Sequence, residues 1–138
     1  MIISKDIKFD CAHMLSNYEG KCANLHGHTY HGTVTLEGDV NPETSMVLDY
    51  NTIKQVVDRF DHAIVFSDLK ERGDAEKALW FWANDNQMKF VTIPGGKSTA
   101  ENMAEYLAVV FTEQPGVKSA HIRLSETDGS WAIAEATK

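Results

Sequence analysis

The chain has 138 residues, 43% of them hydrophobic and 24% charged, a composition that fits a single globular domain with an apolar core. Its 13 basic and 20 acidic residues give a formal charge of −7, which argues against broad binding to nucleic acid or to an anionic membrane surface. No apolar run approaches the ~20 residues that span a bilayer, and the first residues lack the apolar segment of a secretory signal. Only two cysteines occur, so we expect a cytoplasmic protein without a disulfide framework.

The first half of the chain predicts two strands and a helix. Apolar and polar residues alternate over residues 2–13, as in a half-buried strand, and residues 14–25 have the composition of a loop. A second alternating segment over residues 28–37 predicts a second strand. Asp49 can cap a helix that ends near Asp61–His62, with apolar residues at helical spacing.

The second half begins with a segment of unusual composition. Residues 74–87 favour a helix rich in aromatic residues, and residues 89–93 favour a strand before the Pro94–Gly96 break. We treat residues 67–97 as a variable insertion within one domain covering residues 1–138.

A helix and two strands complete the predicted elements. Ser98-Thr99-Ala100-Glu101 has the spacing of a capping box and opens a helix that stops at Pro115–Gly116. Two final strands, over residues 117–125 and 131–136, flank an Asp-Gly pair typical of a hairpin. The order of elements is therefore ββα, the insertion, and αββ.

Six histidines stand out, four of them within residues 13–31. In an extended chain the side chains of His26 and His28 point the same way, onto the apolar face of the second strand, and His13 lies on the apolar side of the first. Three imidazoles could thus converge on a metal ion and leave its fourth position open. His31 has the opposite parity and is excluded, and Cys11 fits a core position better than a ligand. Spacing alone leaves an ordinary structural role for these histidines open.

Several motifs, taken together and in order, resemble the 6-pyruvoyltetrahydropterin synthase family. Each motif is weak alone, but their conjunction runs through nearly the whole chain. The matching segments are Phe9-Asp10-Cys11-Ala12-His13, Gly20–His28, Met46-Val47-Leu48-Asp49-Tyr50, Asp61-His62, Ser98–Asn102 and Ser125-Glu126-Thr127-Asp128.

The resemblance implies a tunnelling fold, ββααββ. It is an α+β architecture with a four-stranded antiparallel sheet, two main helices on one face, and a barrel completed by several chains. We therefore expect a homo-oligomer, a hexamer made of two trimers, with sites at subunit interfaces. The resemblance implies a small-molecule pterin triphosphate as the partner, and the −7 charge argues against nucleic acid and membrane.

The resemblance also implies roles for particular residues. The histidines matching His13, His26 and His28 bind Zn²⁺ in the family. The cysteine matching Cys22 is the catalytic base, which the pair matching Asp61 and His62 activates. The glutamate matching Glu126 anchors the pterin ring and is also counted with the catalytic relay.

Other readings of these residues stay open. Cys22 could be a small loop residue, the Asp61–His62 pair a helix end, and Glu126 a solvated turn acid. Glu101 is more simply a capping residue, with substrate contact second, and Thr99 could contact substrate or only cap the helix. For Trp80, Phe81 and Trp82 we expect core or oligomer contacts.

The spacing Cys-x-x-x-His-Gly-His from Cys22 to His28 resembles the bacterial 6-carboxytetrahydropterin synthases of the queuosine pathway. The expected activity is conversion of 7,8-dihydroneopterin triphosphate to 6-carboxy-5,6,7,8-tetrahydropterin, acetaldehyde and triphosphate. One alternative is the pyruvoyl reaction on the same substrate, and another is a pterin- or zinc-binding module without catalysis. Gly96-Lys97-Ser98-Thr99 replaces the Asn-Pro-Thr common in the family but keeps the threonine.

Overall fold

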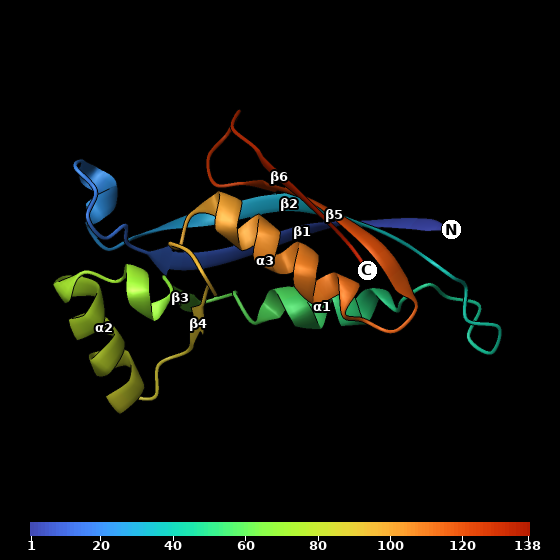
Figure 1. Ribbon diagram of the computed structural model, residues 1–138, viewed down its shortest axis with the longest axis horizontal. Coiled ribbons are helices and arrows are strands. Elements are labelled where there is room, and N and C mark those ends of the chain that lie inside the picture. The colour runs from blue at the N-terminus through green and yellow to red at the C-terminus, as the bar shows by residue number, and fades with distance from the viewer.

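A single mixed sheet of six strands organises the chain, in the order β4-β3-β1-β2-β5-β6. The computed structural model describes all residues, 1–138, and Figure 1 shows the long strands crossing one another in a twisted, curled layer. The strands are β1 Ile2–His13, β2 His26–Gly38, β3 Ala63–Phe66, β4 Phe90–Thr92, β5 Val117–Ser125 and β6 Ala132–Thr137. Strands β1, β2, β5 and β6 pair antiparallel, as predicted.

The expectation of a four-stranded antiparallel sheet is wrong, because two short strands extend it. Strand β3 runs parallel to β1, and β4 runs parallel to β3. β3 follows the first helix almost directly and contains only four residues, so its apolar run cannot be distinguished from the end of that helix by periodicity. The strand predicted at residues 89–93 is present as β4, at one edge of the sheet.

The alternation predicted for β1 and β2 places one face of each strand in the core. Phe9 pairs with Tyr30 across the two strands, and both side chains are buried, with stacked rings whose centroids lie 5.1 Å apart. β2 begins at His26, two residues before its predicted start, so that His13 lies directly opposite His26. The same inward-facing row that forms the core therefore ends in histidines.

Two helices cover the buried face of the sheet, as expected (Figure 1). Helix α1, Tyr50–Asp58, begins after Asp49, whose carboxylate accepts the N–H of Asn51. Helix α3, Ala100–Thr112, packs mainly on β5 and β6. Apolar side chains of both helices join those of the strands in one cluster. No helix in the chain has the length and apolar character needed to cross a membrane.

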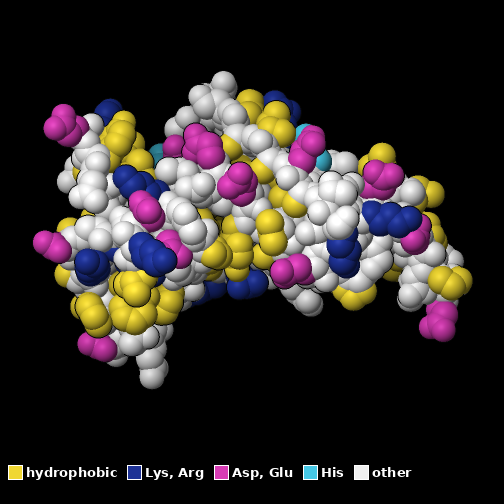
Figure 2. All heavy atoms as spheres, viewed as in Figure 1, with side chains coloured by type: hydrophobic (Ala, Val, Ile, Leu, Met, Phe, Trp, Pro, Cys, Tyr) yellow, Lys and Arg dark blue, Asp and Glu magenta, His cyan; other side chains and the backbone are white.

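The segment expected to be an insertion supplies the edge strand β4, and the part before β4 lies beside that end of the sheet (Figure 1). It contains the short 3₁₀ helix η2, Leu69–Glu71, and helix α2, Asp74–Asp85, which stands apart from α1 and α3 in Figure 1. Trp80 packs edge-on against Phe90 of β4. Phe81 and Trp82 are largely exposed, and Figure 2 shows hydrophobic side chains on the surface where α2 lies. None of the three aromatic residues belongs to the core cluster, so the expected core contact is not formed, and a role in oligomer contacts stays a prediction.

Candidate metal centre

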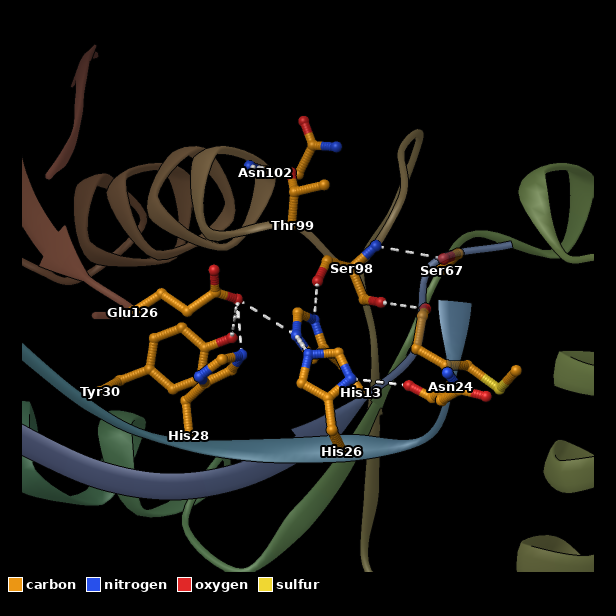
Figure 3. A network of polar contacts seen from close by, with 11 residues as sticks. His13, Asn24, His26, His28, Tyr30, Ser67, Ser98, Thr99, Asn102 and Glu126 are labelled. Carbon is orange, nitrogen blue, oxygen red and sulfur yellow. Dashed lines mark hydrogen bonds and ion pairs between the residues drawn. The ribbon is translucent and has the colours of Figure 1, made fainter. Parts of the chain in front are cut away.

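Three histidines converge where β1 ends and β2 begins. Nε2 of His13 lies 3.1 Å from Nε2 of His26, and one ring nitrogen from each of His13, His26 and His28 lies within 4.8 Å of the others. His13 is buried and the other two are half-buried, and Figure 3 shows the three rings turned toward one another. His31 is exposed on the opposite face, as its parity predicted. The structure therefore brings together the three side chains that the sequence selected.

Two backbone carbonyls fix the orientation of two of these rings. Nδ1 of His13 donates to the carbonyl oxygen of Ser98 at 2.5 Å, and Nδ1 of His26 donates to that of Asn24 at 2.7 Å. A carbonyl oxygen can only accept, so in both rings the hydrogen sits on Nδ1 and Nε2 faces the cluster. Metal-binding histidines are commonly oriented in this way by their second nitrogen.

The cluster requires a positive charge at its centre. Nε2 of His13 faces Nε2 of His26. It also lies 3.1 Å from Oε1 of Glu126, and the same oxygen lies 3.2 Å from Nε2 of His28. Nε2 of His28 is buried without a partner in hydrogen-bonding geometry. Lone pairs brought this close repel unless a proton or a cation lies between them.

Either a proton on His13 or a bound metal ion would supply that charge. In the first case the N–H of His13 donates to Glu126, and this contact lowers the pKa of the carboxyl group. Burial, the largest effect on His28, lowers its pKa and favours the neutral imidazole that binds metals. Three imidazoles beside one carboxylate are donors that suit a transition metal better than Mg²⁺ or Ca²⁺. The residues present therefore fit a metal ion.

Glu126 follows directly on β5 and is held by a residue that the sequence did not single out for the site. The hydroxyl of Tyr30 donates to Oε1 of Glu126 at 3.1 Å, and the Tyr30 side chain is fully buried. Burial first, and then the nearby negative charges, raise the pKa of Tyr30, so its hydroxyl stays a donor. A buried tyrosine needs a partner for its hydroxyl, so the alternation in β2 could have indicated this role.

The proposed base lies outside this network. Cys22 is a half-buried free cysteine in the short 3₁₀ helix η1, Lys21–Ala23, in the loop that leads to His26, and its thiol makes no hydrogen bond with another residue. Cys11 is buried in the core, as expected, and burial raises the pKa of its thiol to about 12. Cys22 is therefore the more accessible of the two thiols.

Asp61 and His62 form an ion pair in the turn between α1 and β3. Oδ2 of Asp61 lies 2.9 Å from Nδ1 of His62, and Oδ1 of Asp61 accepts the backbone N–H of Asp10 at 2.9 Å. The bond from Asp10, followed by that from His62, lowers the pKa of Asp61. His62 is 78% exposed, and no hydrogen bond or ion pair joins it to Cys22. The structure thus joins Asp61 and His62 in an ion pair, but this pair is not hydrogen-bonded to the Cys22 thiol.

The capping box predicted at Ser98 and Glu101 is not formed. The cap of α3 is Thr99, whose hydroxyl accepts the N–H of Asn102 at 3.3 Å, and Glu101 is exposed in the first turn. The helix begins one residue later because both backbone groups of Ser98 are used elsewhere. Its N–H donates to the hydroxyl of Ser67 and its carbonyl accepts from His13 (Figure 3).

The chain is similar to known proteins over nearly its full length. Residues 2–137 match the family model described as 6-pyruvoyl tetrahydropterin synthase. A protein of Haemophilus influenzae named 6-carboxy-5,6,7,8-tetrahydropterin synthase is 34% identical over 137 residues, with 94% of each chain covered. One of Pyrococcus abyssi, named as a putative enzyme of the same kind, is 32% identical over 94% of this chain and 85% of its own.

The fold is also similar to solved structures. The 6-pyruvoyl tetrahydropterin synthase of Plasmodium falciparum superposes with a TM-score of 0.58 at 18% identity, over 100% of this chain and 98% of that one. At this identity the similarity concerns the fold alone, and it agrees with the tunnelling fold predicted above.

Proposed function

The chain belongs to the 6-pyruvoyl tetrahydropterin synthase family, and on this premise we propose that it is a zinc-dependent carbon–carbon lyase. It converts 7,8-dihydroneopterin triphosphate, with consumption of water, to 6-carboxy-5,6,7,8-tetrahydropterin, acetaldehyde and triphosphate. The names of the full-length relatives support the carboxy product. The observation that carries the proposal is the convergence of three histidines beside Glu126.

We assign Zn²⁺ to His13, His26 and His28. When bound, the ion supplies a positive charge that lowers the pKa of hydroxyl groups on the substrate side chain. The backbone carbonyls that hold His13 and His26 keep both rings aimed at the ion. Because these rings are fixed before binding, little ordering remains when the metal enters.

Glu126 is the proposed anchor for the pterin ring. A carboxylate can accept two N–H bonds from the amino-pyrimidine edge of a pterin, a charge-assisted contact. Its lowered pKa keeps it ionised for that purpose, and the hydroxyl of Tyr30 holds Oε1 in place. Thr99 and Glu101, at the start of α3, are proposed as further substrate contacts.

Cys22 is the proposed base that removes a carbon-bound proton, and the Asp61–His62 pair converts its thiol to the thiolate. Because neither Asp61 nor His62 is hydrogen-bonded to Cys22 within one chain, we propose that the relay is completed between copies. The sheet ends in two unpaired strands, β4 and β6, and such edges favour pairing with another chain. A hexamer of two trimers would provide these interfaces.

The proposed setting is queuosine biosynthesis in the cytoplasm, where the two free cysteines would remain reduced. The partners are the pterin triphosphate and other copies of the chain.

Incubation of the purified protein with 7,8-dihydroneopterin triphosphate, followed by mass analysis of the products, tests the activity. Release of triphosphate without acetaldehyde would identify the pyruvoyl reaction instead. Binding without turnover would indicate a pterin-binding module.

Two variants test the relay. Cys22→Ala should abolish turnover while zinc and pterin binding survive. Mixing inactive Cys22→Ala and His62→Ala chains after dissociation should restore part of the activity if the relay is shared between copies. Unchanged turnover in Cys22→Ala would remove the thiol from the mechanism.

A further inference from the structure

A buried carboxylate lies in the insertion, outside the residues assigned above. Glu76, in the first turn of α2, has no exposed surface, and Ala83 is the only other fully buried residue of that helix. Burying a carboxylate is costly unless hydrogen bonds compensate for the loss of water. The buried position of Glu76 therefore carries a substantial desolvation cost, which other groups must offset.

Both oxygens of Glu76 are satisfied by groups from other parts of the chain. Oε1 accepts the backbone N–H of Ser67 at 2.7 Å, and Oε2 accepts the hydroxyl of Ser16. Arg72 holds the same turn from the other side, since its Nε donates to the carbonyl oxygen of Ser67 at 2.7 Å. Its guanidinium also lies over the rings of Phe66 and Trp80. Glu76 and Arg72 thus both bind the backbone of Ser67, and we call these polar contacts the Ser67 junction.

This junction continues directly to the candidate metal centre. The hydroxyl of Ser67 accepts the backbone N–H of Ser98 at 3.1 Å. The carbonyl of Ser98 accepts the Nδ1 hydrogen of His13 at 2.5 Å, and the Ser98 hydroxyl donates to the carbonyl of Met14 at 3.2 Å. Figure 3 shows Ser98 between Ser67 and His13. The backbone of Ser98 is therefore held at its N–H by Ser67 and at its carbonyl by the ring of His13, which it orients.

A second arm of the junction reaches the loop that carries Cys22. Ser16 lies in that loop, and the neighbouring Leu15 donates its N–H to the carbonyl of Cys22 at 2.9 Å. One carboxylate thus connects α2 to the end of β3 and to the loop between β1 and β2.

We propose that Glu76 is a positioning residue for the metal centre, acting through Ser67 and Ser98 to fix the ring of His13. The insertion then has a function, since α2 supplies this carboxylate from outside the sheet. The inference rests on the proposed metal site.

The test compares Glu76→Ala and Glu76→Gln with the unmodified protein. Removal of a group that orients a ligand commonly weakens metal binding by about 10–100-fold. Because Glu76 acts through two further residues, we expect about a 10-fold loss of Zn²⁺ affinity in Glu76→Ala, measured by competition with a chromophoric chelator. The Co²⁺-substituted variant should also have an altered visible spectrum. Glutamine can still accept the N–H of Ser67, so Glu76→Gln should bind Zn²⁺ nearly as tightly as the unmodified protein.

A control separates positioning from a general effect on folding. Thr112 in α3 is also buried, and its hydroxyl donates to the carbonyl of Val109, away from the centre. Thr112→Val should lower thermal stability without changing Zn²⁺ affinity or the Co²⁺ spectrum. If Glu76→Ala fails to fold, Ser67→Ala removes the acceptor for Ser98 and should give the same loss. Unchanged affinity and spectrum in the folded variant would overturn the proposal.

A measurement without metal separates this inference from the proposed function. Nitrogen-15 spectra of the metal-free protein at alkaline pH should show the neutral ring of His13 with its hydrogen on Nδ1, and a mixture of tautomers in Glu76→Ala. Identical spectra in the two proteins would refute the positioning role. Failure of the unmodified protein to bind Zn²⁺ would instead refute the metal site itself, and with it the proposal.

Discussion

Replacement of Tyr30 by phenylalanine tests the contact that holds Glu126. The ring stays packed on Phe9, so the change removes only the hydroxyl that donates to Oε1 of Glu126 at 3.1 Å. A hydrogen bond to a charged group contributes about 1.5–3 kcal/mol. We expect a loss of about 1.5 kcal/mol in the free energy of unfolding, the lower end, because the Glu126 side chain is 31% exposed.

For a chain of this length that loss corresponds to a decrease in Tm of about 6 °C, at roughly 4 °C per kcal/mol. Thermal unfolding of the metal-free protein, followed by circular dichroism at one fixed protein concentration, measures it. The matched control is Tyr106→Phe, because the Tyr106 hydroxyl only accepts a long 3.4 Å hydrogen bond from Arg59 at the surface. Its effect should stay within about 0.5 kcal/mol. Equal losses in the two variants would refute the assignment of Tyr30.

Three further predictions concern the metal and the pterin. His28→Ala should reduce zinc content, measured by elemental analysis, well below one ion per chain, whereas His31→Ala on the opposite face should retain it; full retention in His28→Ala would contradict the ligand set. Glu126→Gln should weaken pterin binding, measured by fluorescence titration, far more than zinc binding, and unchanged pterin affinity would refute its role as the pterin anchor. Protons compete with the metal for the imidazoles, so zinc affinity should fall as the solution is acidified. Burial lowers the pKa of His28 from 6.5, so protonation of His28 contributes to this loss only below that pH. Chelator competition across a pH series measures the loss of affinity.

Much of the fold could be predicted because the relevant signals are local. Alternation in residues 2–13 and 28–37 identified both long strands and the face that each buries, and apolar spacing after Asp49 identified α1. β3 could not be predicted, because four residues carry too little periodicity. Its parallel pairing with β1 depends on the packing of the whole chain, and the local pattern of apolar residues carries no information about that packing.

The candidate site likewise contains residues that the sequence predicts and groups that it does not. Side-chain ligands such as His13 and His26 follow from parity, because a strand fixes the direction of each side chain. The groups that orient them are backbone carbonyls of Ser98 and Asn24, and any residue type could provide a carbonyl. Glu76 reads in the sequence as an ordinary acidic residue in the first turn of a helix. Only the packing of α2 against the end of β3 shows that it is buried.

The pairing of β1 with β2 has a consequence for the order of folding. His13 and His28 lie 15 residues apart (28 − 13), whereas Glu126 lies 98 residues beyond His28 (126 − 28). Closing a short loop loses less entropy than closing a long one, and contacts close in sequence form faster. All three imidazoles can therefore assemble in a nascent hairpin before β5 docks. Zinc should then accelerate refolding in stopped-flow experiments, and an unchanged rate would show that the hairpin forms only after the folding barrier has been crossed.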